Sequence, residues 1–250
     1  MIQVLILLSI GAVGGFLSGL LGIGGGVILI PLLVYVGHTS IAVAASANIV
    51  VIIFASISGG AVHYGKGNVH ALTGTWMGLA SMVGALVGSL SSNVFSEEFF
   101  YYLYMALVAA AIIILLFPRP EERATSTEYQ LRRLPTVFIG LFKGFVTGVL
   151  GIGGSFIVIP LTIYFLDMPI HMAVGTSLLV TLFSAVAGFF GKLAIGHFDL
   201  SVIIWVVLGV IPTTQVGVWA AQKSSPRLLR LFLGILLVGI LIWMIWSVLL

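Results

Sequence analysis

The chain has 250 residues, of which 60% are hydrophobic and only 7% are charged, and its mean hydropathy is +1.27. This composition excludes an ordinary soluble domain and predicts an integral membrane protein that is all-α and polytopic. The formal charge of +3 is scattered over loops, which argues against nucleic-acid binding, and the absence of cysteine excludes disulfides and thiolate metal sites.

Residues 2–36 form one apolar run that is interrupted by Gly22, Gly24, Gly25 and Gly26. About 20 helical residues span a bilayer once, so this run is too long for one span and short for two. We therefore predict a hairpin of two short helices, 2–21 and 26–37, with its glycine turn inside the membrane. Two ordinary tilted spans are the alternative interpretation.

Further apolar segments predict the remaining helices in chain order. Three follow the hairpin, at 41–62, 70–90 and 98–117, and complete a first half that covers residues 1–117. Residues 118–134 hold seven of the seventeen formal charges and two prolines, which is typical of a solvated linker. The second half, 135–250, begins with a hairpin at 135–166 and continues with segments at 171–191, 199–222 and 228–249.

The two halves are copies of one sequence pattern. Gly15–Pro31, GFLSGLLGIGGGVILIP, returns 129 residues later as Gly144–Pro160, GFVTGVLGIGGSFIVIP, with 11 of 17 positions identical. The same offset pairs Trp76 with Trp205 without a gap. Such agreement indicates duplication rather than chance glycine content.

The positive charges predict how the halves are inserted in the membrane. Lys and Arg are retained on the cytoplasmic side of short loops, so Arg119, Arg123, Arg132 and Arg133 place the linker inside. If each hairpin returns to its starting side, each half makes three net crossings. The halves are then inverted relative to each other, and both chain termini are outside. Inverted repeats are the architecture in which two similar halves alternate around a central site.

The glycine clusters are the predicted substrate site. Glycine permits backbone conformations that other residues avoid, and proline lacks an N–H, so we expect each helix to break at the glycines and at Pro31 or Pro160. Main-chain donors that the break releases at a helix start attract anions. The predicted site contains the turn residues Gly22, Gly24, Gly25, Gly26, Gly151, Gly153, Gly154 and Ser155.

Polar residues after the hairpins extend this candidate site. Ser46 and Asn48 follow the first hairpin, and Thr176 and Ser177 follow the second, where they could donate hydrogen bonds to a substrate oxygen or only join helices. Thr181, Ser184 and Gln215 are further polar positions of the second half, and Gln215 is added to the site as a glutamine expected to be buried.

Two other residues carry simpler expectations. Lys143, in the second hairpin, could meet an anion, but its side chain is expected to extend to the cytoplasmic surface. Gly11, on the regular part of the first helix, is expected to tolerate a larger side chain.

Enzyme and metal sites are not indicated by the sequence. GIGGG lacks the following GK[ST] of a phosphate loop, and Ser155 has no base beside it that could activate a nucleophile. The five histidines stand in loops or at segment ends without metal-ligand spacing. No metal, cofactor or catalytic residue is predicted.

The duplicated GFxxGxxGIGGG motif with its proline, the basic GKGN turn and the charged central linker resemble the sulfite exporter TauE/SafE family, also called the 4-toluene sulfonate uptake permease family. The resemblance covers nearly the whole chain. It implies a multi-pass carrier of the prokaryotic inner membrane for sulfur-containing anions such as sulfite or organosulfonates. Ser155 in place of a glycine, and Ser46-Ala47-Asn48 opposite Gly175-Thr176-Ser177, depart from a symmetric pattern.

The sequence therefore predicts a secondary transporter of small sulfur-containing oxyanions that works by alternating access, with the lipid bilayer and a small anion as its partners. An anion channel of the same architecture, a non-transporting membrane scaffold and an intramembrane enzyme are the alternatives. The coupling ion, H⁺ or Na⁺, and the oligomeric state are not indicated.

Overall fold

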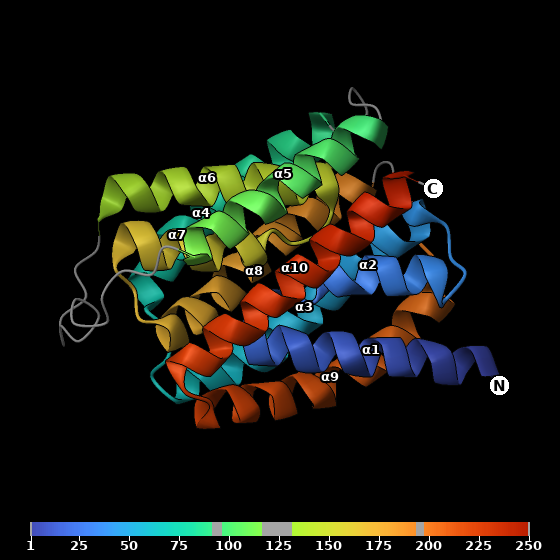
Figure 1. Cartoon of the computed structure of the whole chain (residues 1–250), viewed down its shortest axis with the longest axis horizontal. Helices are drawn as coiled ribbons and strands as arrows, with labels where there is room; N and C mark the ends of the chain where they lie inside the picture. Colours follow the sequence, from blue (N-terminus) through green and yellow to red (C-terminus); the bar gives the residue numbers. More distant parts are fainter. Residues whose placement is uncertain (1, 92–96, 117–131, 194–197, 250) are drawn as a thin grey trace.

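The computed structural model describes residues 2–91, 97–116, 132–193 and 198–249 as an all-helical bundle, without a strand in those ranges (Figure 1). The predicted linker, 118–134, lies outside the described residues up to position 131, and so do Arg119 and Arg123. The helices are α1 (Ile2–Leu21), α2 (Gly26–Tyr35), α3 (Ile41–Gly65), α4 (Ala71–Ser91), α5 (Glu97–Leu116), α6 (Arg133–Leu150), α7 (Ser155–Leu166), α8 (Ile170–Leu193), α9 (Leu200–Lys223) and α10 (Pro226–Leu249).

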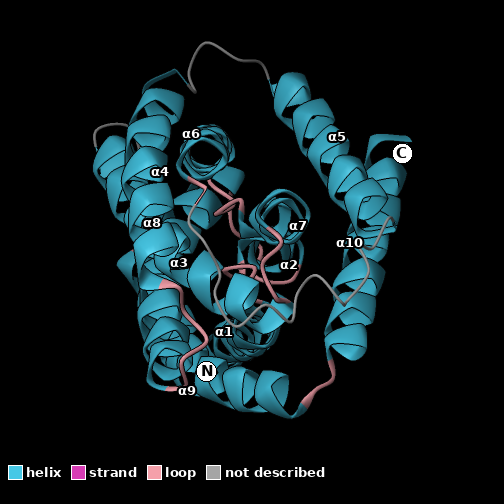
Figure 2. Cartoon of the chain, turned by 90° about the vertical axis from the view of Figure 1, so that its left-hand side faces the viewer, coloured by secondary structure: helices cyan, strands magenta, loops and turns pink. Residues whose placement is uncertain are grey.

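Equivalent helices of the two halves begin at equivalent residues. Helices α2 to α5 start at 26, 41, 71 and 97, and α7 to α10 start 129 residues later, at 155, 170, 200 and 226. In Figure 1 the α1–α2 hairpin occupies the right-hand part of the bundle and the α6–α7 hairpin the left-hand part, while both termini lie at the right-hand end. Figure 2 shows the hairpin helices in the centre, with α3, α4 and α8 on the left and α5 and α10 on the right.

The first helix of each hairpin packs against the fourth helix of the other half. On α1, an added Cβ at Gly11, Gly15 or Gly19 would overlap backbone atoms of α9, and at Gly140, Gly144 or Gly148 of α6 it would overlap backbone atoms of α4. Glycines four residues apart on one face allow such close approach in lipid. We call these two contacts the glycine seams. The expectation that Gly11 tolerates a larger side chain is wrong, because its Cβ would meet the carbonyl of Val206.

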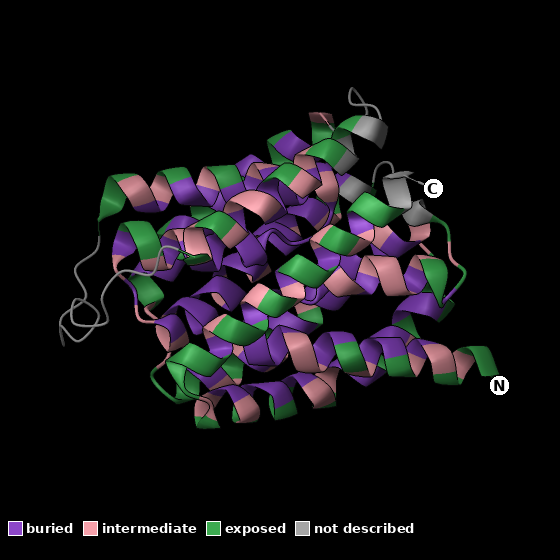
Figure 3. Cartoon of the chain, in the orientation of Figure 1, coloured by how far each residue is buried: buried purple, intermediate pink, exposed green. Residues whose placement is uncertain are grey.

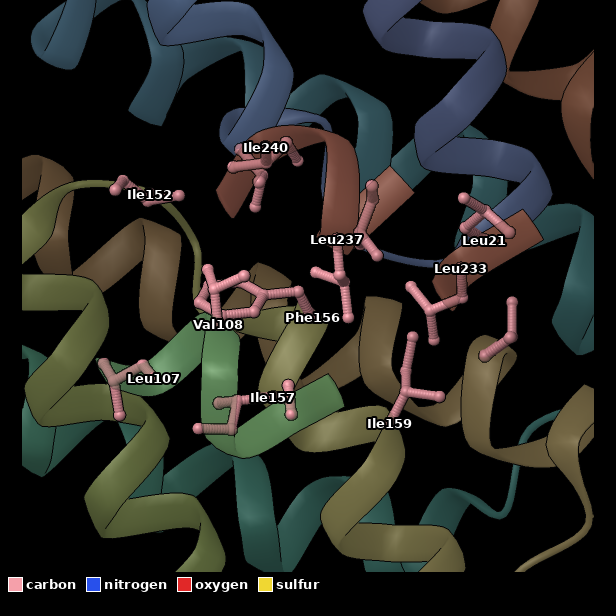
Figure 4. Packing of buried hydrophobic residues seen from close by; sticks show 14 of the residues in the cluster. Leu21, Leu107, Val108, Ile152, Phe156, Ile157, Ile159, Leu233, Leu237 and Ile240 are labelled. Carbon is pink, nitrogen blue, oxygen red and sulfur yellow. The ribbon is translucent and has the colours of Figure 1, made fainter. Parts of the chain in front are cut away.

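Buried residues face the interior of the bundle around the hairpins, and exposed residues lie on its outer face (Figure 3). Phe156 of α7 lies in a buried cluster with Val108 of α5 and Leu237 of α10 (Figure 4). Large hydrophobic side chains remain exposed along the outer helices, among them Ile235, Ile242 and Trp246 of α10. An apolar exterior over an apolar core fits a lipid environment.

Seven of the described helices are long and apolar enough to span a membrane: α1, α3, α4, α6, α8, α9 and α10. The first helix of each hairpin is thus long enough to span, with 20 residues in α1, whose bounds agree with the predicted 2–21, and 18 in α6, while α2 and α7 have only 10 and 12. At about 1.5 Å per residue, α2 and α7 are too short to cross a bilayer core of about 30 Å.

Candidate functional site

Each hairpin turns at a pair of glycines in the left-handed backbone region. Gly24 and Gly25 have φ of 73° and 72°, and Gly153 and Gly154 have φ of 82° and 59°. Side-chain-bearing residues rarely adopt this region, so the glycines determine where the helices break. Pro31 and Pro160 do not break them, contrary to the prediction, because α2 and α7 continue through both prolines. A proline removes one backbone donor, which a packed membrane helix tolerates.

The turns leave several main-chain donors without a protein acceptor. Gly22 and Gly151 use their N–H groups to end α1 and α6, donating to the carbonyls of Ser18 and Thr147 over 2.8 Å. Within the described residues no backbone acceptor is found for the N–H groups of Gly24, Gly25 and Gly26, or of Gly153, Gly154 and Ser155. Neither α2 nor α7 has a side-chain cap. Both turns therefore offer donors at the positive end of a helix dipole.

The two turns lie against each other near the middle of the bundle. A Cβ on Gly24 would be 3.5 Å from Ser155 Oγ, and a Cβ on Gly26 would be 2.5 Å from the carbonyl oxygen of Ile152. Ile52 of α3 and Thr181 of α8 lie beside both turns, within 4 Å of a Cβ on Gly24 or on Gly153. Because Ile52 and Thr181 are equivalent positions of the repeat, each half contributes one side chain to this meeting point.

Asn48 and Ser177, also equivalent positions, hold the turns together. Asn48 Nδ2 donates to the carbonyl of Gly151 over 2.7 Å, and Ser177 Oγ donates to the carbonyl of Gly22 over 2.9 Å. Each side chain thus fixes the end of the other half's first hairpin helix. The donors that the sequence assigned to a substrate oxygen are directed at the backbone, while Asn48 Oδ1 is buried and has no partner among the described residues.

The other polar candidates are placed less centrally. Thr176 Oγ1 accepts the N–H of His70 over 3.0 Å, so it fixes the α3–α4 connection. Ser46 is buried on α3. Gln215 is exposed on α9, so the prediction of a buried glutamine is wrong.

A chain of polar side chains leads from α6 to the start of α7. Lys143 is fully buried and its Nζ donates to Ser184 Oγ of α8. One helical turn earlier on α8, Thr181 Oγ1 is hydrogen-bonded to Ser155 Oγ, the first residue of α7. The expectation that Lys143 reaches the membrane surface is wrong, because α4, α7 and α8 enclose this part of α6 (Figure 2).

The polar chain was visible in the sequence only in part. Ser177, Thr181 and Ser184 are spaced by four and three residues, so helical periodicity places them on one face of α8. That face could have identified Thr181 and Ser184 as members of the site. Nothing in the sequence indicates that Lys143 reaches Ser184, since this contact joins residues 41 positions apart.

No group of three or more His, Asp or Glu side chains that could hold a metal ion occurs in the described part of the chain.

The apolar bundle and its paired helix breaks define a polytopic membrane protein with a duplicated turn at its centre. The sequence model of the family described as "Sulfite exporter TauE/SafE" matches residues 7–244, and the chain belongs to this family of membrane transporters.

Curated relatives agree with that family. The chain is 29% identical to the probable membrane transporter protein YdhB of Bacillus subtilis, over 81% of this chain and 84% of the relative. It is 26% identical to a probable membrane transporter protein of Xylella fastidiosa, over 98% of this chain and 95% of the relative. A probable membrane transporter protein of Methanocaldococcus jannaschii is 24% identical over 93% and 91% of the two chains. No solved structure matches the chain significantly.

Proposed function

We propose that this protein is a secondary transporter that binds a small oxyanion between its two glycine turns. The observation that carries the proposal is the meeting of two helix starts, α2 and α7, whose main-chain donors have no acceptor among the described residues. Buried backbone donors without partners are costly, and an anion at two helix N-termini satisfies them. Gly24, Gly25, Gly26, Gly153, Gly154 and Ser155 form the proposed site, with Asn48 and Ser177 holding its two sides together.

Sulfur-containing oxyanions are the proposed substrate class. The family description names a sulfite exporter, and the site offers N–H and O–H donors, which suit the acceptor oxygens of sulfite, sulfate or a sulfonate group. Ile52 and Thr181 lie beside both turns in this conformation. Admission of an anion therefore requires the turns to move apart.

Alternating access is supported by the packing of each hairpin against a helix of the other half. Each hairpin is joined through its glycine seam to the fourth helix of the other half, so movement of one half carries the other half's turn with it. The hairpins lie at opposite ends of the bundle in Figure 1, as an inverted repeat requires. Two similar halves that exchange conformations around a shared site are the usual basis of alternating access.

The function is tested with purified protein reconstituted into liposomes. We expect saturable uptake of sulfite, sulfate, thiosulfate or methanesulfonate, and stimulation of that uptake by the same anion loaded inside, because a carrier exchanges substrate across one site. Flux that rises linearly with concentration and shows no such stimulation would favour the anion channel. No flux and no binding of any of the four anions would contradict the proposed function.

The proposed orientation is tested by cysteine labelling of this cysteine-free chain. Ser40, the N-cap of α3, and Ser225, which caps the start of α10, are both exposed. Single Ser40→Cys and Ser225→Cys variants should react with a membrane-impermeant maleimide from opposite sides, Ser40→Cys from outside, since the basic residues near α10 favour the cytoplasm. Labelling of both cysteines from the same side would exclude the proposed topology.

A further inference from the structure

Lys143 is an ionisable side chain in the interior, and no carboxylate of the described residues lies beside it. Among the residues whose side chains are described, it is the one Lys, Arg, Asp or Glu that is buried. The seven acidic residues of the chain stand at helix ends or in the 118–134 segment. A buried ammonium without a counterion is strongly unfavourable, and such residues in membrane proteins generally mark the path of an ion. Ser184 supplies a neutral hydroxyl, which does not offset the charge.

The position of Lys143 relates it to the second glycine turn. A Cβ on Gly154 would lie 3.6 Å from Lys143 Cγ, so the lysine stem passes beside this turn. Its Nζ contacts Ser184, one helical turn from the Thr181 hydroxyl that is bonded to Ser155. The ammonium is therefore close to the first residue of α7 and its main-chain donors.

Only the second half of the repeat carries this lysine. The position equivalent to Lys143 is Gly14, where a Cβ would be 2.6 Å from Leu29 Cγ, so the first half has no room for a side chain there. The positions equivalent to Ser155, Thr181 and Ser184 are likewise Gly26, Ile52 and Ala55. The polar chain of Lys143, Ser184, Thr181 and Ser155 thus has no counterpart in the first half.

We propose that Lys143 is the cation that binds the transported anion, and that it makes the site selective for doubly charged oxyanions. This inference rests on the proposed function. Each helix N-terminus supplies roughly half a positive charge, so the two turns together offer about +1 and the lysine raises the total to about +2. That charge balances a dianion such as sulfate or sulfite, whereas a sulfonate, with one negative charge, leaves the site positive. On binding, the ammonium exchanges the Ser184 hydroxyl for a substrate oxygen.

The experiment measures binding of sulfate and methanesulfonate to detergent-purified full-length protein by isothermal titration calorimetry. The wild type should bind sulfate more tightly than methanesulfonate. Lys143→Met keeps the length of the side chain and removes its charge, and it should weaken sulfate binding by about ten- to a hundredfold. Its effect on methanesulfonate should be smaller, so the preference for the dianion falls. Lys143→Arg should retain that preference, and Lys66→Met, at an exposed lysine, should behave as wild type.

The outcomes separate this inference from the function on which it rests. If Lys143→Met lowers both affinities equally, or neither, while Gly153→Val abolishes binding, the turn site remains and Lys143 has only a structural role. A wild type that prefers methanesulfonate overturns the charge selection even if no lysine variant folds. A wild type that binds neither these anions nor sulfite and thiosulfate contradicts the proposed function itself.

Discussion

Gly153→Val should abolish anion binding while the protein still folds. Gly153 has φ of 82°, which a β-branched residue adopts only with strain of about 1–3 kcal/mol. Its Cβ would also lie 2.9 Å from Ile52 Cδ1, at the point where the two turns meet. The valine therefore shifts the turn and places methyl groups beside the main-chain donors that we assign to the substrate. Calorimetric titration with sulfite and sulfate measures the loss.

A matched glycine variant separates this effect from a general effect of bulk. Gly239 of α10 is exposed, and no atom lies within 4 Å of an added Cβ. Gly239→Val should therefore bind anions as the wild type does. Elution of Gly153→Val as a monodisperse peak would show that the bundle is intact. Undiminished binding in that folded variant would place the anion site away from the turns.

The class of fold was predictable because membrane helices obey strong compositional constraints. Long apolar segments predicted an all-α polytopic bundle, and this prediction is confirmed. The helix break was assigned to the correct glycines but also, wrongly, to Pro31 and Pro160. Proline excludes only one hydrogen bond, whereas left-handed dihedrals at two consecutive glycines reverse the chain. The bounds predicted for the first hairpin helix, 2–21, agree with α1, whereas α2 ends at Tyr35, two residues before the predicted end at 37.

The candidate site was predictable in its backbone and much less so in its side chains. The repeated glycines show where donors are released, because that depends on local conformation. The partners of Asn48, Ser177 and Lys143 depend on which helices adjoin, and those contacts join residues 103, 155 and 41 positions apart. The exposure of Gln215 likewise depends on how α9 faces α1. A single sequence contains no information on these distant contacts beyond periodicity.

The glycine seams explain why the bundle contains so many glycines outside its turns. On α6, Gly144 lies against α4, where an added Cβ would overlap the carbonyl of Ser81 and lie 2.7 Å from its Cα. At the equivalent Gly15 of α1, an added Cβ would lie 2.6 Å from the carbonyl oxygen of Val210 on α9. Backbone atoms cannot rotate away as a flexible side chain can. A larger side chain therefore fits only if the two helices of the seam move apart, and this separation loses van der Waals packing along the whole seam.

Gly144→Val should therefore destabilise the protein more than any substitution at the turns. Overpacking against backbone costs about 1–3 kcal/mol or more, and here it acts where the second hairpin joins the first half. We expect a melting temperature in detergent that is lower by many degrees, or loss of the monodisperse protein. Gly15→Val should do the same at the other seam. Gly60→Ala is the control, since its Cβ would meet only Leu178 Cβ, at 4.0 Å. If Gly144→Val has the same melting temperature as the wild type, α4 and α6 are not in close contact. That result would also contradict the proposed coupling between each hairpin and the opposite half.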